Sequence, residues 1–401
     1  MAMRRKLLIA AGPGEWRAVL LENDVPVELH VERGDSGAVG SAHLGRVVKR
    51  VDALGAVLVD IGDERPGFLP NRDILPEFGR LDEGGRVLVQ VRREAQRGKA
   101  ARLSTRFLRQ PAADDEAGEW PAARRAAAMR LEPPMRLDPA TGFAAALAAR
   151  LPGVPQRVRA DDVAIIPELR AGFPESGVEH AADLPVDIDA LFETALAGTL
   201  ALSGGGLVHI EEARAATVID IDSGSPETGS PERAGLAVNL AAARVIAQQL
   251  RLRQIGGGVV IDFVGLEGRG PRDRVRAALA EAAATDPARP EILGWSRLGH
   301  LELVRPRRLR PLADVLLEPP PGGGLAKTAA TIAFESLRAL WREARQTPSA
   351  NWRLLVSPVA AAALRGPAAA ALRGLEGRLG RAVAISAEPG RPRDNFEIIP
   401  V

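Results

Sequence analysis

The sequence has 401 residues, 46% of them hydrophobic, and 53 basic side chains nearly balance 51 acidic ones, which leaves a net charge of +2. A chain of this length predicts two or more domains with substantial cores. It contains no run of eighteen apolar residues, and the apolar run near the N-terminus is too short for a signal peptide. We therefore expect a cytoplasmic protein without a membrane span. The absence of cysteine excludes disulfides and cysteine-ligated zinc or iron–sulfur sites.

The first hundred residues are predicted to be rich in β-structure. Residues 6–10, 16–21 and 25–31 are apolar runs separated by turn residues, which predicts a small antiparallel sheet within a first segment, 1–36. Residues 37–108 continue with short Val-rich strands, glycine turns and a basic rim. This pattern is typical of a small β-barrel.

The composition changes after the barrel. Residues 109–203 open with acids and Pro- and Ala-rich sequence, which predicts a linker, and later contain a predicted helix at 188–197. Residues 316–325 are a Pro/Gly linker. Residues 326–401 combine helical and strand patterns, which predicts a small C-terminal α/β domain.

Residues 204–315 are predicted to form an α/β layer. Its expected elements are strands at 207–210, 216–222, 259–263 and 291–295 and helices at 234–253 and 272–284. In such a layer, ligands bind beyond the carboxyl ends of the strands, so we expect the functional site there.

Three aspartates lie near the ends of two of these strands. Asp220 and Asp222 are two residues apart, so both side chains point to one face of their strand, and Asp262 stands near the end of the later strand. One interpretation is that one of these acids sits at a strand end, either solvated or capping the next turn. The other is a carboxylate site for a hard cation, because an acid within a buried strand is costly unless it is paired or binds a metal. Two such strands with a helix between them favour the cation site.

The predicted barrel carries a recognisable pattern between residues 45 and 70. Gly-x-Val is followed after a gap by Ala-x-x-Val-Asp-x-Gly and then by Gly-Phe-Leu-Pro. This pattern resembles the OB-fold RNA-binding module of the ribosomal S-one type. The resemblance implies that Phe68 is an exposed aromatic on which a base stacks, whereas the alternative places its ring in the barrel core. The module's other stacking aromatic would fall near Leu58, which predicts weaker stacking.

Several motifs between residues 205 and 312 together resemble the ribonuclease E/G family. They are residues 218–223 (VIDIDS), Asn239, residues 241–249, 250–257 (LRLRQIGG), 260–263 (VIDF) and 296–302 (SRLGHLE). The barrel precedes them in the family's order, and the C-terminal segment resembles the family's small domain more weakly. The resemblance implies a multi-domain α/β fold. Its parts would be a ribonuclease-H-like sheet with an inserted OB-fold barrel, a deoxyribonuclease-I-like α/β catalytic domain and a small C-terminal α/β domain.

The resemblance also implies an activity, that of a Mg²⁺-dependent endoribonuclease. Such an enzyme would hydrolyse single-stranded, AU-leaning RNA, such as ribosomal precursor or messenger RNA, and leave a 5′-phosphate, and Mn²⁺ is expected to substitute for Mg²⁺. Asp220 and Asp262 match the family's metal ligands. Asp222 falls where the family usually has Asn, and is expected to act catalytically by holding or orienting the attacking water.

The expected RNA contacts are an aromatic ring and a set of cations. They are Phe68, Lys99, Arg251, Arg253, Arg269, Arg272 and Arg297. Arginine suits bidentate contacts with phosphate, although a solvated helix face is the alternative for each one. The five histidines show no metal-ligand spacing and are expected to be ordinary surface or core residues.

Departures from the family pattern lead to further expectations. Residues 317–321 read Leu-Glu-Pro-Pro-Pro where family members often have a Cys-Pro-x-Cys zinc link, so no zinc and no zinc-linked homo-oligomer is expected. The segment before residue 204 is short, which predicts that the family's 5′-monophosphate sensor is largely absent. Asp222 in place of Asn leaves a second hypothesis open, an RNA-binding protein of ribosome assembly or RNA handling that has lost efficient catalysis.

Overall fold

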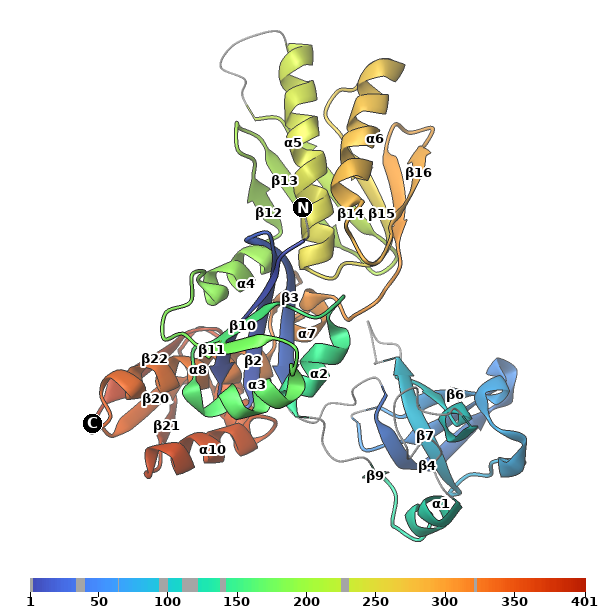
Figure 1. The fold of residues 1–401 in the computed structure, drawn as a ribbon, viewed down its shortest axis with the longest axis vertical. Helices are drawn as coiled ribbons and strands as arrows, with labels where there is room; N and C mark the ends of the chain where they lie inside the picture. Colours follow the sequence, from blue (N-terminus) through green and yellow to red (C-terminus); the bar gives the residue numbers. More distant parts are fainter. Residues whose placement is uncertain are drawn as a thin grey trace. The chain divides into compact units, whose positions relative to one another are not determined.

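The computed structural model describes residues 3–33, 40–63, 65–93, 100–109, 122–137, 142–224, 231–320 and 323–401. The chain forms two compact units. One comprises residues 34–142, and the other comprises the chain up to Arg33 together with Phe143–Val401. Both contain strands, and the whole is a mixed α/β protein, as predicted (Figure 1). Among the described residues, every helix is too short or too polar to cross a membrane.

The unit of residues 34–142 is built around a closed five-stranded barrel, consistent with an OB-like fold. Its strands pair in the order β5 (Ala56–Asp60), β6 (Gly67–Pro70), β8 (Arg102–Ser104), β7 (Arg86–Arg93) and β4 (Ala42–Val51). Pairing of β4 with β5 closes the ring. Val59, Leu69 and Val89 are among the buried side chains that fill it.

This unit extends beyond residue 108, where the sequence predicted a linker. Helix α1 (Ala122–Ala128) and strand β9 (Met135–Arg136) belong to it, and β9 pairs with β4. Between them, Glu132 accepts hydrogen bonds from Arg46 at 3.3 Å and Arg86 at 2.6 Å. These contacts attach the segment to the barrel, so the predicted boundary is too early.

The larger unit begins with a five-stranded sheet in the order β11–β10–β1–β2–β3. β1 (Arg5–Gly12), β2 (Glu15–Glu22) and β3 (Val25–Arg33) are antiparallel, as predicted, and β10 (Arg157–Ala160) and β11 (Gly177–His180) run parallel to β1. Helices α2 (Phe143–Arg150) and α3 (Ile166–Gly172) cover one face of the sheet. Helices α4 (Ile188–Leu196) and α7 (Leu312–Leu316) cover the other, so that all eight residues of β2 are buried.

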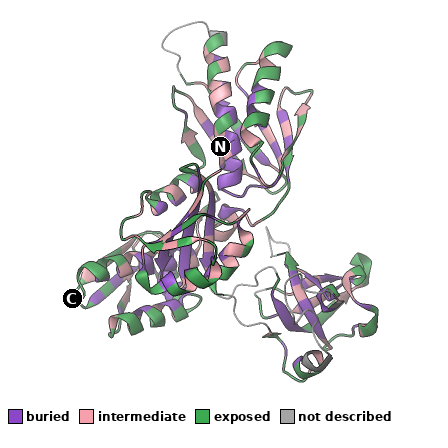
Figure 2. Ribbon diagram, viewed as in Figure 1, coloured by how far each residue is buried: buried purple, intermediate pink, exposed green. Residues whose placement is uncertain are grey.

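A six-stranded sheet follows in the same unit. Its order is β12 (Thr199–Ala201), β13 (Leu207–Glu212), β14 (Thr217–Asp222), β15 (Gly257–Asp262), β17 (Leu301–Arg305) and β16 (Glu291–Trp295). Helices α5 (Pro231–Leu252) and α6 (Arg269–Ala283) lie side by side on one face (Figure 1) and bury Ile219 and Ile261. Val218 and Val304 on the other face are 45% and 40% exposed, so this face is open to solvent. Figure 2 colours the sheet and its two helices by the burial of their residues.

The C-terminal part contains a three-stranded sheet with β20 (Trp352–Val356) between β21 (Ala384–Ala387) and β22 (Phe396–Pro400). Helices α8 (Ala329–Gln346), α9 (Pro358–Arg365) and α10 (Ala369–Leu379) complete its core. This part thus contains both helices and strands, and its strand β22 was not expected. The stretch predicted as a linker forms a short hairpin of β18 (Leu317–Glu318) and β19 (Ala326–Lys327), with residues 321–322 outside the described part.

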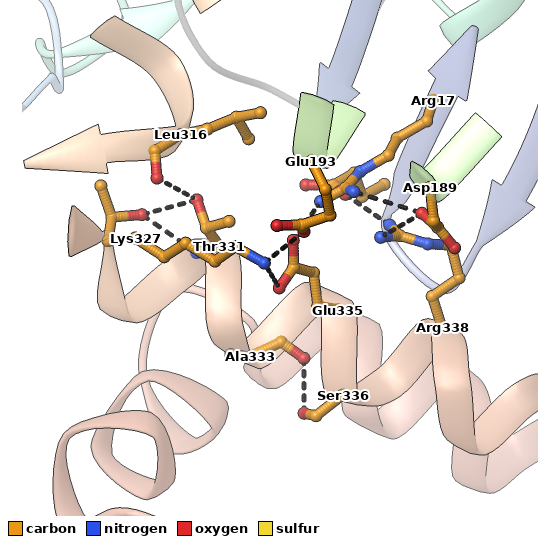
Figure 3. Close-up of polar contacts among 12 residues, drawn as sticks. Arg17, Asp189, Glu193, Leu316, Lys327, Thr331, Ala333, Glu335, Ser336 and Arg338 are labelled. Atoms are coloured by element: carbon orange, nitrogen blue, oxygen red, sulfur yellow. Dashed lines mark hydrogen bonds and ion pairs between the residues drawn. The ribbon is translucent and has the colours of Figure 1, made fainter. Parts of the chain in front are cut away.

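Helix α8 is joined to the N-terminal sheet by buried ion pairs. Glu15 on β2 is fully buried and accepts hydrogen bonds from Arg17 at 3.0 Å, Arg33 at 2.7 Å and Arg338 at 2.6 Å. Burial by itself raises the pKa of Glu15, but the charges of Arg33, Arg17 and Arg338 outweigh it and lower the pKa from 4.5 to about 2. Figure 3 shows Arg17 continuing the network to Glu335 of α8, at 2.8 Å.

Candidate active site

Asp220 and Asp262 are direct neighbours on adjacent strands. β14 and β15 run parallel with Asp220 in register with Asp262, and neighbouring strands lie about 4.8 Å apart. Both side chains are exposed on the open face of the sheet, near the carboxyl ends of the two strands. The fold thus brings together two carboxylates that stand far apart in the sequence.

The strands that carry these acids are half-buried, whereas the sequence suggested fully buried strands. In β14, buried Ile219 and Ile221 alternate with exposed Asp220 and Asp222, so the two aspartates share one face, as predicted. Because α5 and α6 cover only the opposite face, the acids face solvent and bear no burial penalty. Burial therefore does not demand a metal at these aspartates, contrary to the expectation from the sequence, and the cation site is supported by the register of Asp220 with Asp262.

Asp222 ends β14 in a tightly built turn. Its Oδ1 accepts a hydrogen bond from the backbone N–H of Gly224 at 2.8 Å. Gly206 lies beside it with φ +92°, and a Cβ there would come within 2.7 Å of the Asp222 carbonyl oxygen. Glycine is thus required next to Asp222, and the carboxylate of Asp222 already has one structural role.

Two histidines flank the aspartate pair, although the sequence predicted ordinary positions for them. His300 places its Nε2 3.6 Å from Oδ2 of Asp262. His209 on β13 is in register with Asp220, and its Nδ1 lies 2.9 Å from Oγ1 of Thr199. His209 comes from β13 and His300 from the turn that precedes β17, so no spacing in the sequence could have revealed the arrangement.

The donor set of the aspartate pair fits Mg²⁺. In the parts of the chain that the structure describes, no three His, Cys, Asp or Glu side chains come together so as to hold a metal ion by themselves. Mg²⁺, however, is usually bound through one or two carboxylates, with waters and substrate phosphate completing its shell. Asp220 and Asp262 could supply two such carboxylates.

Arg251 and Arg253 are buried in the protein, and their prediction as RNA contacts is corrected. Arg251 donates to Glu22 at 2.7 Å and to Glu28 at 3.0 Å, so it joins the end of α5 to the N-terminal sheet. Arg253 donates to Gln249 at 2.7 Å and to backbone carbonyls, and burial lowers its pKa to about 10. With these partners inside the protein, neither guanidinium is available to phosphate.

The other predicted arginines lie at the surface. Arg269 has a 94% exposed side chain with Asp273 at 3.4 Å, and Arg297 is also exposed. Arg272 is partly covered, with its guanidinium 5.4 Å from the ring centre of Trp295. Arg269 and Arg297 are therefore accessible to a polyanion, whereas the guanidinium of Arg272 contacts Trp295.

Phe68 lies on the outer side of the barrel. It is half-buried between Gly67 and Leu69, which are buried, and it is in register with Leu58 on one neighbouring strand and Arg102 on the other. Its ring therefore faces away from the barrel core. Lys99, the remaining predicted RNA contact, lies outside the described residues.

Comparison with known proteins finds similarity to one family. The model of the ribonuclease E/G family matches residues 180–308, which include both aspartates. Ribonuclease G of Salmonella typhimurium (strain SL1344) is 26% identical over 489 positions, covering 99% of this chain and 100% of the relative. The chain is thus similar to the ribonuclease E/G family, over residues 180–308 to the family model and over nearly its whole length to this ribonuclease G. Since the alignment needs 489 positions for a chain of 401 residues, part of that relative has no counterpart here.

Relatives named ribonuclease E align over shorter regions. Ribonuclease E of Escherichia coli (strain K12) is 25% identical over 431 positions, covering 85% of this chain and 41% of the relative. Ribonuclease E of Nostoc sp. (strain PCC 7120) is 37% identical over 143 positions, covering 35% of this chain and 21% of the relative. The chain is thus similar to both branches of the ribonuclease E/G family.

Proposed function

We propose that this protein is a Mg²⁺-dependent endoribonuclease that hydrolyses phosphodiester bonds of single-stranded RNA and leaves 5′-phosphate ends. The register of Asp220 with Asp262 carries the proposal, because it puts two carboxylates together within the region that matches the ribonuclease E/G family. The relatives named ribonuclease G and ribonuclease E support RNA as the substrate class. Ribosomal precursor RNA and messenger RNA are the proposed targets, in the cytoplasm, and any homo-oligomer would form without zinc.

The finer fold assignment is part of the same proposal. Three antiparallel strands followed by two parallel to the first support a ribonuclease-H-like sheet. The barrel interrupts this sheet in the sequence between Arg33 and Phe143, which supports an inserted OB-fold module. The six-stranded sheet with α5 and α6 on one face would be the deoxyribonuclease-I-like catalytic domain.

Each acid at the site has a proposed role. Asp220 and Asp262 would hold the ion, and a bound Mg²⁺ would supply positive charge that polarises the scissile phosphate and favours ionisation of water. Asp222 would orient the attacking water, because its carboxylate lies on the same face as Asp220 and is fixed by the Gly224 N–H. Its negative charge stands where the family resemblance implies a neutral amide.

The proposed RNA contacts in the described residues are the predicted side chains that are exposed at the surface. Phe68, half-exposed on the outer side of the barrel, would stack on a base. Arg269 and Arg297, exposed in the larger unit, would contact phosphates and contribute an affinity that falls with added salt. Lys99 remains a proposed contact on the basis of the sequence alone.

The test is cleavage of an unstructured oligoribonucleotide by the purified full chain with Mg²⁺ or Mn²⁺. Asp262→Asn, which removes a charge at nearly constant shape, should abolish cleavage while the circular dichroism spectrum stays unchanged. Glu291→Gln is the matched control, since it removes an exposed carboxylate from the edge strand β16 of the same sheet. Retained cleavage in Asp262→Asn would overturn the site assignment.

The second candidate is an RNA-binding protein of ribosome assembly or RNA handling without efficient catalysis. The observation that favours it is Asp222, whose additional carboxylate stands beside the place where an anionic phosphate must bind. Binding of the same oligoribonucleotide without turnover would support it. If cleavage occurs, equal rates on 5′-hydroxyl and 5′-monophosphate RNA would support the proposal that the 5′-sensor is largely absent, and a strong monophosphate preference would refute it.

A further inference from the structure

We infer that Asn239 and Arg272 are positioning residues that hold the loop after Asp262 and thereby set the direction of its carboxylate. The inference rests on the proposed metal site at Asp220 and Asp262. It adds two side chains, both outside the pair of carboxylates, on which metal affinity should depend.

Asp262 needs such support because the sheet holds it less firmly than Asp220. Asp220 is in register with His209 on one side and with Asp262 on the other. Asp262 is the last residue of β15, and on the side of β17 the register ends one residue earlier, at Ile261 and Leu301. A strand end paired on one side frays more easily than a strand centre. The orientation of Asp262 therefore depends on what holds the chain immediately after it.

Asn239 holds the backbone two residues beyond Asp262. This asparagine of α5 is fully buried, its Nδ2 donates to the carbonyl oxygen of Val264 at 2.7 Å, and its Oδ1 accepts from the Val264 N–H at 3.1 Å. The side-chain amide of Asn239 thus pairs with both backbone polar groups of Val264. Because a buried amide without partners is costly, the pair fixes the loop to the helix.

Arg272 holds the same loop from the other side. Its Nε donates to the carbonyl oxygen of Leu266 at 3.2 Å, and its guanidinium lies 5.4 Å from the ring centre of Trp295. Trp295 in turn packs against Phe263, the residue directly after Asp262, with ring centres 5.9 Å apart. Arg272 thus links the loop to the strand β16, which explains its partly covered position better than phosphate binding does.

Binding of Mn²⁺, followed through the electron paramagnetic resonance signal of the free ion, tests this without reference to RNA cleavage. Asn239→Ala should weaken Mn²⁺ binding about tenfold, the lower end of the effect of removing groups that support metal ligands. Gln249→Ala is the matched control, because it removes another buried amide from α5, one that contacts Arg253. It should lower the unfolding midpoint and leave Mn²⁺ affinity unchanged.

Arg272→Lys provides a second variant should Asn239→Ala fail to fold. Lysine keeps the positive charge but loses the Nε–H donor and the flat face that rests on Trp295. If Arg272 served only to attract phosphate, Mn²⁺ affinity would stay at the wild-type value, which would overturn the positioning role, whereas a several-fold loss would support it.

The two proposals fail in distinguishable ways. Wild-type protein with no saturable Mn²⁺ binding, or with binding that survives Asp220→Asn, would overturn the metal site itself. Wild-type binding that Asp220→Asn removes, and that Asn239→Ala and Arg272→Lys leave unchanged, would overturn the positioning role alone.

Discussion

Glu15→Gln should destabilise the protein strongly, because Glu15 is the buried carboxylate on which Arg17, Arg33 and Arg338 converge. The three arginines lower its pKa from 4.5 to about 2, a difference that corresponds to about 3 kcal/mol of folding free energy at neutral pH. Removing one partner of a buried ion pair typically costs about 3–5 kcal/mol, which agrees in size. We therefore expect Glu15→Gln to lose about 3 kcal/mol at pH 7.

The assay is urea denaturation of the full chain at several pH values, followed by tryptophan fluorescence. Because the folded-state pKa of Glu15 is depressed, its contribution to stability is complete above pH 4.5 and is lost as the pH falls towards 2. Over that window the wild type should lose more stability than Glu15→Gln, which has no carboxyl at this position. Glu179→Gln, which breaks an exposed pair with Arg159, is the control and should leave the unfolding midpoint in place. A cost below about 1 kcal/mol for Glu15→Gln at pH 7, the range of exposed ion pairs, would refute the reasoning.

The remaining predictions concern RNA binding and the site. Arg251→Gln should destabilise the protein by about 3 kcal/mol, since it removes a buried cation that is paired with two buried acids, and should leave the salt dependence of RNA binding unchanged. Arg269→Ala should do the reverse. It should keep the unfolding midpoint and reduce, by about one, the slope of log RNA affinity against log salt concentration. Phe68→Ala should weaken RNA binding by about 1–3 kcal/mol in fluorescence anisotropy, and unchanged affinity would exclude stacking there. Asp222→Asn retains the acceptor for the Gly224 N–H and removes a charge, so cleavage rates should not fall; a loss would show that the carboxylate itself is needed.

The elements around the site could be predicted from the sequence because their signals are local. Alternation in β14 places Asp220 and Asp222 on one face whatever packs behind the strand, and the apolar stripe of α5 identifies that helix by itself. The role of Arg251 could not be predicted, because its partner Glu28 stands 223 residues earlier in the chain. Whether a strand is covered on one face or two is likewise a property of the assembled layers. For that reason the aspartates were expected in buried strands and are found facing solvent.

The same distinction explains why arginine-rich helices mislead in this chain. Arg251 and Arg269 both looked like phosphate contacts, yet one is buried against Glu22 and Glu28 and the other is 94% exposed. The sequence gives the charge of each residue. Whether an arginine is available to phosphate depends on whether the fold pairs it with an acid from another layer.

Helix α5 covers the six-stranded sheet and also connects the loop after Asp262 to the N-terminal sheet. Asn239 near its middle holds the loop after Asp262, and Arg251 at its end is fixed to Glu22 and Glu28 of the N-terminal sheet. The two anchors are separated by about 18 Å of continuous helix at the usual rise per residue. Both anchors are buried and hydrogen-bonded, so sliding of the helix would break the bonds of Asn239 to Val264 and those of Arg251 to the two acids. The position of Asp262 is thereby linked through helix α5 to the N-terminal sheet. The position of Asp220 is held by its neighbours in the six-stranded sheet. The relative placement of the two carboxylates is therefore a property of the whole larger unit and not of the two strand ends alone.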